Sequence, residues 1–127
     1  MMPDAAWLRE QFERCLPFLQ PAIDRAGGAY DAEYVWDRIA DETVRFWPYR
    51  NSAVVTRVEQ LPNGERQIYW WLAGGDLDEI LAMHDPIIEW ARGEGCTRSE
   101  MVCRRGFAKP LKDLDYQETA VTLTRRI

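Results

Sequence analysis

The sequence lacks several features that would assign a function directly. Among 127 residues it has one histidine, His84, and three cysteines, Cys15, Cys96 and Cys103. An odd, scattered set of cysteines does not suggest a disulfide framework, and the spacing to His84 matches no usual zinc site. There is no apolar run long enough to cross a bilayer, and the start MMPDAAWLRE has no signal-peptide pattern. We therefore expect a protein of a reducing compartment, with no metal site and no membrane association.

The chain also lacks an excess of positive charge. Its formal net charge is -5, which argues against binding to nucleic acid or to an anionic membrane. It has no internal repeat, low-complexity stretch or convincing linker, and 46% hydrophobic residues are enough for a packed core. We expect one domain over residues 1–127, in which residues 1–28 form an N-terminal helix that packs loosely or contacts a partner.

What the sequence does contain is an alternation of helical and strand patterns, which favours helices covering a sheet. The patterns first predict two helices: one whose far end is limited by Pro17 and Pro21, and one from Asp31 that carries Trp36, Ile39, Ala40, Thr43 and Trp47. A loop over 47–51 follows, and then a hairpin of two strands over 53–59 and 65–72. After a turn over 73–75, the patterns predict a helix from Asp76 to Gly95, a strand around 101–102, a helix over 105–114 and a strand over 119–125.

The helix that begins at Asp76 is the best specified. Leu77, Ile80 and Ile87 belong to one apolar stripe at helical spacing. Asp76 is a natural N-cap, and Glu79 three residues later completes a capping-box pattern. Gly95 is well placed to end the helix in a left-handed conformation, and Gly93 is an alternative end a turn earlier.

This order of elements resembles the GNAT superfamily of acyl-CoA-dependent N-acetyltransferases. The stretches WWLAGGDLDEI, IIEWARGEGC and RRGFAKPLKDLDY look like a group of short GNAT-like proteins encoded by tailed bacteriophages, over roughly residues 30–127. The resemblance implies an α/β (α+β) fold with a mostly antiparallel mixed central sheet flanked by helices. It also implies a phage origin, with synthesis in the host cytoplasm and a place in the virion.

The resemblance directs attention to the residues that would hold a cofactor. A GNAT enzyme places an Arg/Gln-x-x-Gly-x-Gly/Ala loop between its central strand and the next helix, where backbone N–H groups receive the pyrophosphate of acyl-CoA. Here Gly74 and Gly75 remain, but the arginine or glutamine is missing. Asp76, Asp78 and Glu79 put three carboxylates on the first helical turn, where they repel a pyrophosphate. We expect no cofactor; if acetyl-CoA does bind, Gly74 and Gly75 are the candidate contacts.

No catalytic residue is predicted. Many GNAT enzymes use a tyrosine in a Tyr-x-x-x-Gly-Phe pattern as general acid, and aligning Asp115 and Tyr116 with the Gly-Phe pair puts Leu111 at the tyrosine position. Tyr116 is then expected to pack against the start of the last strand. His84 is expected to be a helix-flank residue, because nothing in the sequence pairs it with a partner.

Aromatic and basic residues suggest contacts with a partner. Strand alternation sends Trp70 and Trp71 to opposite faces of the sheet, and either the helices of the domain cover both faces or a partner covers one. Tryptophan, tyrosine and arginine are typical interface anchors. The candidate partner contacts are Trp47, Tyr49, Trp71, Arg104 and Arg105.

Two hypotheses of different classes follow. The first, which the missing cofactor residues favour, is a non-catalytic phage accessory protein that assembles with other virion or morphogenesis proteins, copies of this chain included. The second is an active acetyl-CoA-dependent N-acetyltransferase that modifies a host or phage amine.

Overall fold

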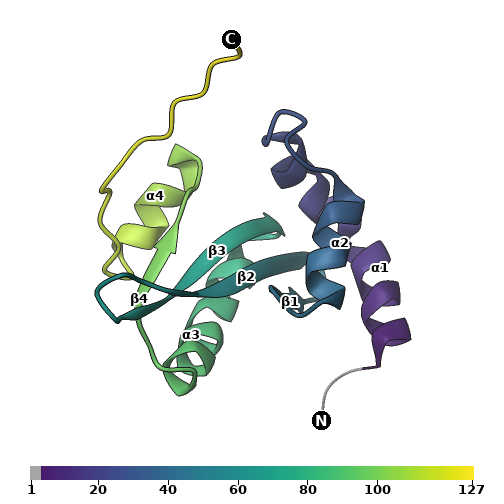
Figure 1. Cartoon of the computed structure of the whole chain (residues 1–127), viewed down its shortest axis with the longest axis horizontal. Helices are drawn as coiled ribbons and strands as arrows, with labels where there is room; N and C mark the ends of the chain where they lie inside the picture. The colour runs from purple at the N-terminus through teal and green to yellow at the C-terminus, as the bar shows by residue number, and fades with distance from the viewer. Residues whose placement is uncertain (1–3) are drawn as a thin grey trace.

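The computed structural model describes residues 4–127, apart from the side chain of Arg105. Its elements are α1 (Ala5–Asp24), α2 (Ala32–Ala40), β1 (Arg45–Pro48), β2 (Ser52–Gln60), β3 (Arg66–Gly75), α3 (Leu77–Gly93), β4 (Cys96–Met101) and α4 (Arg105–Lys112) (Figure 1). The sheet has the order β1-β2-β3-β4, in which the first two pairs are antiparallel and β3–β4 is parallel. The predicted fold class, a mostly antiparallel mixed sheet between helices, is confirmed.

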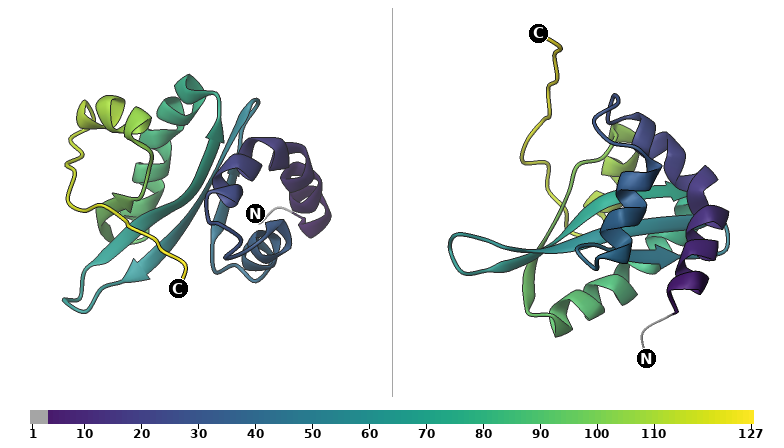
Figure 2. Two further views of the ribbon diagram at one scale, coloured as in Figure 1. Left: turned by 90° about the horizontal axis from the view of Figure 1, so that it is seen from above. Right: turned by 45° about the vertical axis from the view of Figure 1, so that its right-hand side comes forward.

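Helices cover both faces of the sheet. Figure 2 shows α1 and α2 on one face, with α3 and α4 on the other. Trp70 belongs to the core cluster beneath α3, whereas Trp71 packs against the cluster beneath α1 and α2, so the prediction that they face opposite ways is confirmed. The pairing of β2 with β3 shifts between Val55 and Thr56, whose partners are Leu72 and Trp70. Trp71 is therefore the extra residue of a β-bulge.

Helix α1 continues through both of its prolines, so the prediction that Pro17 and Pro21 limit its far end is wrong. The buried stripe of this helix, Phe12, Cys15, Leu19 and Ile23, extends to the last turn. Burial of that stripe against β2 and β3 outweighs the backbone hydrogen bonds that each proline removes.

The segment after α2 also differs from the prediction. The helix ends at Ala40, and Glu42 takes a left-handed conformation (φ 65°), so Thr43 and Trp47 do not lie on it. Trp47 instead lies in β1, within the stretch that was predicted to be a loop. Pro48 ends this strand at the edge of the sheet, where the missing N–H of a proline is tolerated.

The hairpin and α3 agree well with the sequence patterns. β2 and β3 are longer than predicted, and residues 73–75 are the end of β3 rather than a turn. Asp76 caps α3 by accepting the N–H of Glu79 (3.1 Å), and Gly95 adopts φ 85° just beyond the helix, as predicted. No helix among residues 4–127 is long and apolar enough to span a membrane.

The C-terminal part departs most from the prediction. β4 lies earlier than expected, α4 ends at Lys112, and residues 119–125 form no strand. Figure 1 shows residues beyond α4 running as an extended tail, which pairs with no strand within residues 4–127. Arg126 donates a hydrogen bond to the carbonyl oxygen of Gly27 (2.6 Å), which ties the tail to the turn after α1.

Candidate functional site

The start of α3 is where the sequence resemblance places a cofactor loop, and the chain's own atoms occupy it. The backbone of Phe18 in α1 lies so close to Gly74 that a Cβ there would come within 2.8 Å of the Phe18 carbonyl carbon. Gly75 has φ 105°, and a Cβ on it would lie 2.5 Å from Cα of Ser52. Close packing of α1 and β2 therefore explains both glycines without a ligand.

The polar groups of this helix start are also engaged. The Asp76 N–H donates to the carbonyl of Asn51 (2.9 Å). The Glu79 carboxylate accepts the N–H of Asn51 (2.9 Å) and the hydroxyl of Ser52 (2.7 Å), instead of the Asp76 N–H that a capping box requires. Half of the predicted capping box is therefore wrong, because Glu79 fastens the loop before β2 rather than its own helix.

Charge at the start of α3 opposes a pyrophosphate. The hydroxyl of Ser52 and the N–H of Asn51 hold the pKa of Glu79 below its ordinary value, so this side chain is an anion near neutral pH. Asp76 and Asp78 add two further carboxylates within the same turn. The residues at this place do not fit the acyl-CoA pyrophosphate, since its negative charge would meet three anions.

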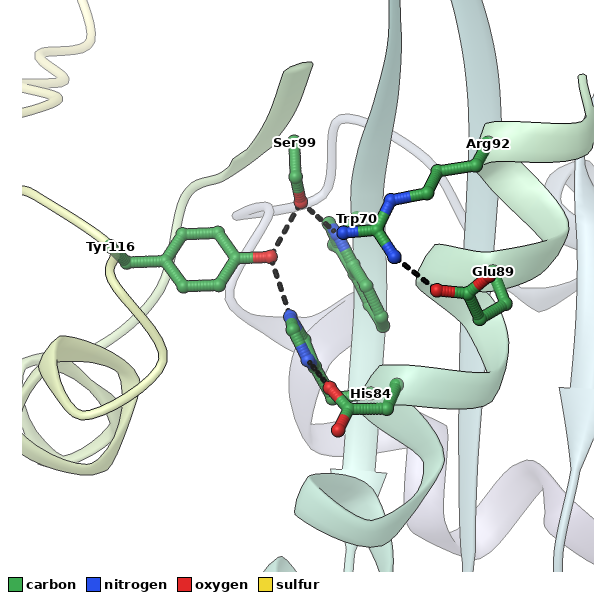
Figure 3. Close-up of polar contacts among 7 residues, drawn as sticks. Trp70, His84, Glu89, Arg92, Ser99 and Tyr116 are labelled. Atoms are coloured by element: carbon green, nitrogen blue, oxygen red, sulfur yellow. Dashed lines mark hydrogen bonds and ion pairs between the residues drawn. The ribbon is translucent and has the colours of Figure 1, made fainter. Parts of the chain in front are cut away.

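A second cluster of polar groups lies between α3, β4 and the segment after α4. Figure 3 shows that the Tyr116 hydroxyl reaches both Ser99 and His84. It lies 2.6 Å from the Ser99 Oγ and 2.8 Å from the His84 Nε2. The His84 Nδ1 lies 3.0 Å from a carboxylate oxygen of Asp85, and the Trp70 Nε1–H donates to the Ser99 Oγ (2.7 Å).

The donors and acceptors of this cluster permit one direction of proton donation when His84 is neutral. The exposed Asp85 carboxylate only accepts, so the His84 Nδ1 carries the proton and the Nε2 accepts. Tyr116 must then donate to His84, and Ser99 must donate to Tyr116. The result is a continuous chain of hydrogen bonds from Trp70 through Ser99, Tyr116 and His84 to a carboxylate in solvent.

Burial strengthens this series of hydrogen bonds. His84 is only 8% exposed and its ring stacks on Trp70, with the ring centroids 5.6 Å apart. Burial raises the pKa of Tyr116, the hydrogen bonds with Ser99 and Trp70 act in the opposite direction, and the Asp85 charge adds to the rise. Tyr116 therefore keeps its proton at neutral pH.

The cluster borders a cavity of about 890 Å³ between α3, β4, α4 and the tail. Its lining combines apolar residues of the helices, Ile88, Ala91 and Leu111 among them, with the hydroxyl groups of Ser99 and Tyr116 and with charged side chains that include Arg92, Arg98 and Glu100. The volume is within the range of small-molecule sites, and the lining is more charged than that of most such sites.

Comparison with known proteins gives a result for structure but none for sequence. No protein-family model and no curated protein matches the chain. Its structure is similar to an aminoglycoside acetyltransferase from an uncultured soil metagenomic sample, with a TM-score of 0.64, 10% identity and coverage of 98% of this chain and 92% of that chain. The chain has a GNAT-like fold.

Two further solved acetyltransferases support the GNAT-like fold. An acetyltransferase of Trypanosoma brucei matches with a TM-score of 0.58 and 8% identity, over 76% of this chain and 78% of that chain. Glucosamine-6-phosphate N-acetyltransferase of Arabidopsis thaliana matches with a TM-score of 0.50 and 10% identity, over 60% of this chain and 56% of that chain. At such low identity, the likeness concerns the fold alone.

Two sequence predictions about the GNAT-like site are wrong. His84 has partners on both ring nitrogens, and Tyr116 joins a polar network rather than packing against a strand. Leu111, which aligned with the general-acid tyrosine, is buried and accepts the backbone N–H of Tyr116 (3.2 Å). The available signal was that His84 lies on the buried stripe of α3, between Ile80 and Ile87. A polar side chain on such a stripe needs a hydrogen-bonding partner.

The predicted partner contacts do not form one surface. Trp47 packs edge-on against Trp90 and donates to the Thr56 hydroxyl, and Trp71 is half-buried with its Nε1–H donating to the Tyr30 hydroxyl. Tyr49 and Arg104 are exposed. The side chain of Arg105 lies outside the described part of the chain.

Sequence reasoning missed a shallow hollow beside Tyr49. Trp7, which is 46% exposed, and Tyr49, which is 44% exposed, both line it. The Arg14 guanidinium donates to the carbonyls of Tyr49 (2.7 Å) and Arg50 (2.9 Å), which fixes the loop between β1 and β2. Two aromatic side chains on a fixed frame fit the description of interface anchors.

Proposed function

We propose that this chain is a non-catalytic accessory protein that uses a GNAT-like scaffold to assemble with other virion or morphogenesis proteins of a tailed bacteriophage. The observation that carries the proposal is the engagement of the α3 start by the chain's own groups, with Phe18 against Gly74 and Asn51 bound to Asp76. The phage assignment is supported by the resemblance of the sequence stretches described above.

The physical argument depends on what a pyrophosphate would need at this place. It requires free N–H groups, space above the glycines and a positive local potential. Here the Asp76 N–H is bound to the Asn51 carbonyl, the Glu79 N–H is bound to the Asp76 carboxylate, and the space that a side chain on Gly74 would take holds backbone atoms of α1. Binding would have to replace these hydrogen bonds and overcome the repulsion of three carboxylates.

The exposed surface offers contacts for assembly. Trp7 and Tyr49 stand beside each other around the hollow, and Arg50 brings a positive charge to the same place. Arg104 is exposed at the N-cap of α4. These residues are the first choice for substitution in any assay of association.

The proposal is tested by calorimetric titration of the full chain with acetyl-CoA. We expect no heat of binding, and micromolar binding would refute the non-catalytic reading. Asp78→Asn is the informative variant, because the Asp78 side chain makes no hydrogen bond among residues 4–127. Binding gained in this variant would assign the exclusion to the Asp78 charge, and continued absence would assign it to the remaining carboxylates, Asp76 and Glu79, and to the groups that already bind the start of α3.

A second candidate is an N-acetyltransferase that acts on a host or phage amine with acetyl-CoA. The observation that favours it is the Tyr116 hydroxyl, which borders the cavity and keeps its proton at neutral pH, as a general acid must. It is tested by following acetyl transfer from acetyl-CoA to a panel of amines, with Tyr116→Phe as the matched variant. Transfer that falls by 10²-fold or more in that variant would establish a general acid.

A further inference from the structure

Helices α3 and α4 cover the same face of the sheet and carry opposite charges. Helix α3 contains four acidic residues and one basic residue, whereas α4 contains three basic residues and no acidic one. Lys109 and Lys112 are the only lysines of the chain, and both are exposed. Because the whole chain has a formal net charge of -5, the positive charge of α4 is a local feature beside a negative one.

The acidic residues of α3 point away from the core. Asp78, Asp85 and Glu89 are spaced by seven and four residues, which places them on one side of the helix, opposite the buried stripe of Ile80, His84, Ile87 and Ala91. The side chains of Asp85 and Glu89 are 86% and 67% exposed. Glu89 pairs with Arg92 on the same helix, an exposed contact that contributes little and is easily exchanged.

The charges of these two helices are available to a partner. Within the described part of the chain, neither lysine of α4 forms an ion pair, and neither does Asp78. The outer carboxylates of α2 differ, because Glu33 pairs with Arg9 and Asp41 pairs with Arg38. A positive partner surface would therefore meet more available negative charge on α3 than on α2.

The arrangement of the two helices makes this face complementary to itself. Figure 2 shows α3 and α4 on one side of the sheet, and both helices line the cavity between them. A two-fold axis perpendicular to this face would bring α3 of one copy against α4 of the other, and the same contact would form a second time. A two-fold interface requires such self-complementarity, since the same patch is used by both copies.

We propose that the face formed by α3 and α4 joins two copies of this chain in a two-fold dimer. The outer carboxylates Asp78, Asp85 and Glu89 of each copy then face Lys109 and Lys112 of the other copy. Opposite charges at both contacts steer the two copies toward this orientation and disfavour the one in which like helices meet.

The size of this face sets the expected strength of the dimer. Helix α3 has 17 residues and is about 25 Å long, so a patch two helices wide covers roughly 500 Å² on each copy. This area is at the low end of specific interfaces, and the dimer is expected to be weak and sensitive to salt. The dimer names one partner for the assembly role proposed above and rests on it, but titration with acetyl-CoA and measurement of mass are independent, so either proposal can fail alone.

The test measures the mass of the full chain by sedimentation at about 50 mM and about 500 mM salt. We expect a dimer whose dissociation constant rises about 10-fold or more at the higher salt. Two variants each reverse the charge of one helix: Asp78→Lys with Glu89→Lys on α3, and Lys109→Glu with Lys112→Glu on α4. Each variant alone should be a monomer, because like charges then meet at both contacts. An equal mixture of the two should dimerise, because one copy has two basic helices and the other has two acidic ones.

The matched control is Glu10→Lys with Asp37→Lys. It changes the net charge as much as the α3 variant does, at exposed positions of α1 and α2 on the other face of the sheet. The control should dimerise like the original chain. Circular dichroism identifies any double variant that fails to fold, and the single substitutions Glu89→Lys and Lys109→Glu then take its place.

Four outcomes would overturn the proposal. A monomer at low salt would show that the copies do not associate. A dimer that persists in both reversed variants would show that another surface joins the copies. A mixture of the reversed variants that stays monomeric would contradict the pairing of α3 with α4. A mass that keeps rising with concentration would show an open head-to-tail contact instead of a closed two-fold one.

Discussion

Substituting Gly74 by alanine tests whether this glycine serves packing or a ligand. An ideal Cβ at this position would lie 2.8 Å from the carbonyl carbon of Phe18, and closer still to its oxygen. Ordinary contacts of a Cβ lie at 3.4–4 Å, so α1 would have to retreat by at least 0.6 Å. Both opposing atoms belong to the backbone, and therefore no rotamer change can relieve the clash.

The cost follows from what holds α1 in place. Its stripe includes Phe12, Cys15 and Leu19, each no more than 1% exposed, and a shift of the helix disturbs all of them together. Overpacking of a tight core costs about 1–3 kcal/mol and sometimes more, so we expect Gly74→Ala to lose about 3 kcal/mol of unfolding free energy. The matched control is Gly93→Ala at the end of α3, where a Cβ meets nothing within 4 Å. It should be neutral or stabilise by up to about 1 kcal/mol.

Urea unfolding followed by tryptophan fluorescence measures both changes, provided the slope against urea stays the same in the variants. A Gly74→Ala loss below about 1 kcal/mol would refute the packing argument. If that variant were stable and bound acetyl-CoA more weakly than the original chain, Gly74 would be a ligand contact instead.

Three further predictions concern the surroundings of this site. Trp71→Ala should cost about 3 kcal/mol in urea unfolding, because the half-buried ring packs against the core cluster beneath α1 and α2; a loss below about 1 kcal/mol would mark it as a surface anchor. Tyr116→Phe should lower the unfolding free energy by about 1–3 kcal/mol, since it leaves the buried Nε2 of His84 without its partner, and an unchanged value would contradict the network. Glu79 has a lowered pKa in the folded state, so its contribution is present above the unfolded value of about 4.3 and is lost as pH falls through the folded value. Glu79→Gln should therefore show a shallower loss of stability as pH falls below about 4.3, and equal slopes would contradict the bond to Ser52.

The sequence predicted well those elements whose conformation is determined by interactions between residues close together in the chain. Asp76 caps α3 because its carboxylate reaches the N–H three residues later, and that geometry needs no tertiary contact. The hairpin around Gly64 follows equally from two strand patterns separated by a turn. Such signals are local, and tertiary packing has little to override.

The incorrect predictions concern elements and contacts that are determined by residues far apart in the sequence. Pro17 does not end α1, because the buried stripe on both sides of it is held by the sheet. His84 and Tyr116 are 32 residues apart, and neither one signals the other in the sequence. The tail was predicted to be a strand from its composition, but composition cannot supply the edge to which a strand must pair.

The pair Gly74-Gly75 shows why the function is harder to read than the fold. A glycine signals that something comes close to the backbone, and the sequence cannot say whether that neighbour is a ligand or another part of the chain. Here the neighbours are Phe18 and Ser52, both of this chain. The proton-carrying network at Tyr116 lies at a different place, between α3, β4 and the segment after α4. Within the described residues 4–127 no hydrogen bond joins the two places. The result of titration with acetyl-CoA therefore has to be judged separately from the effect of Tyr116→Phe.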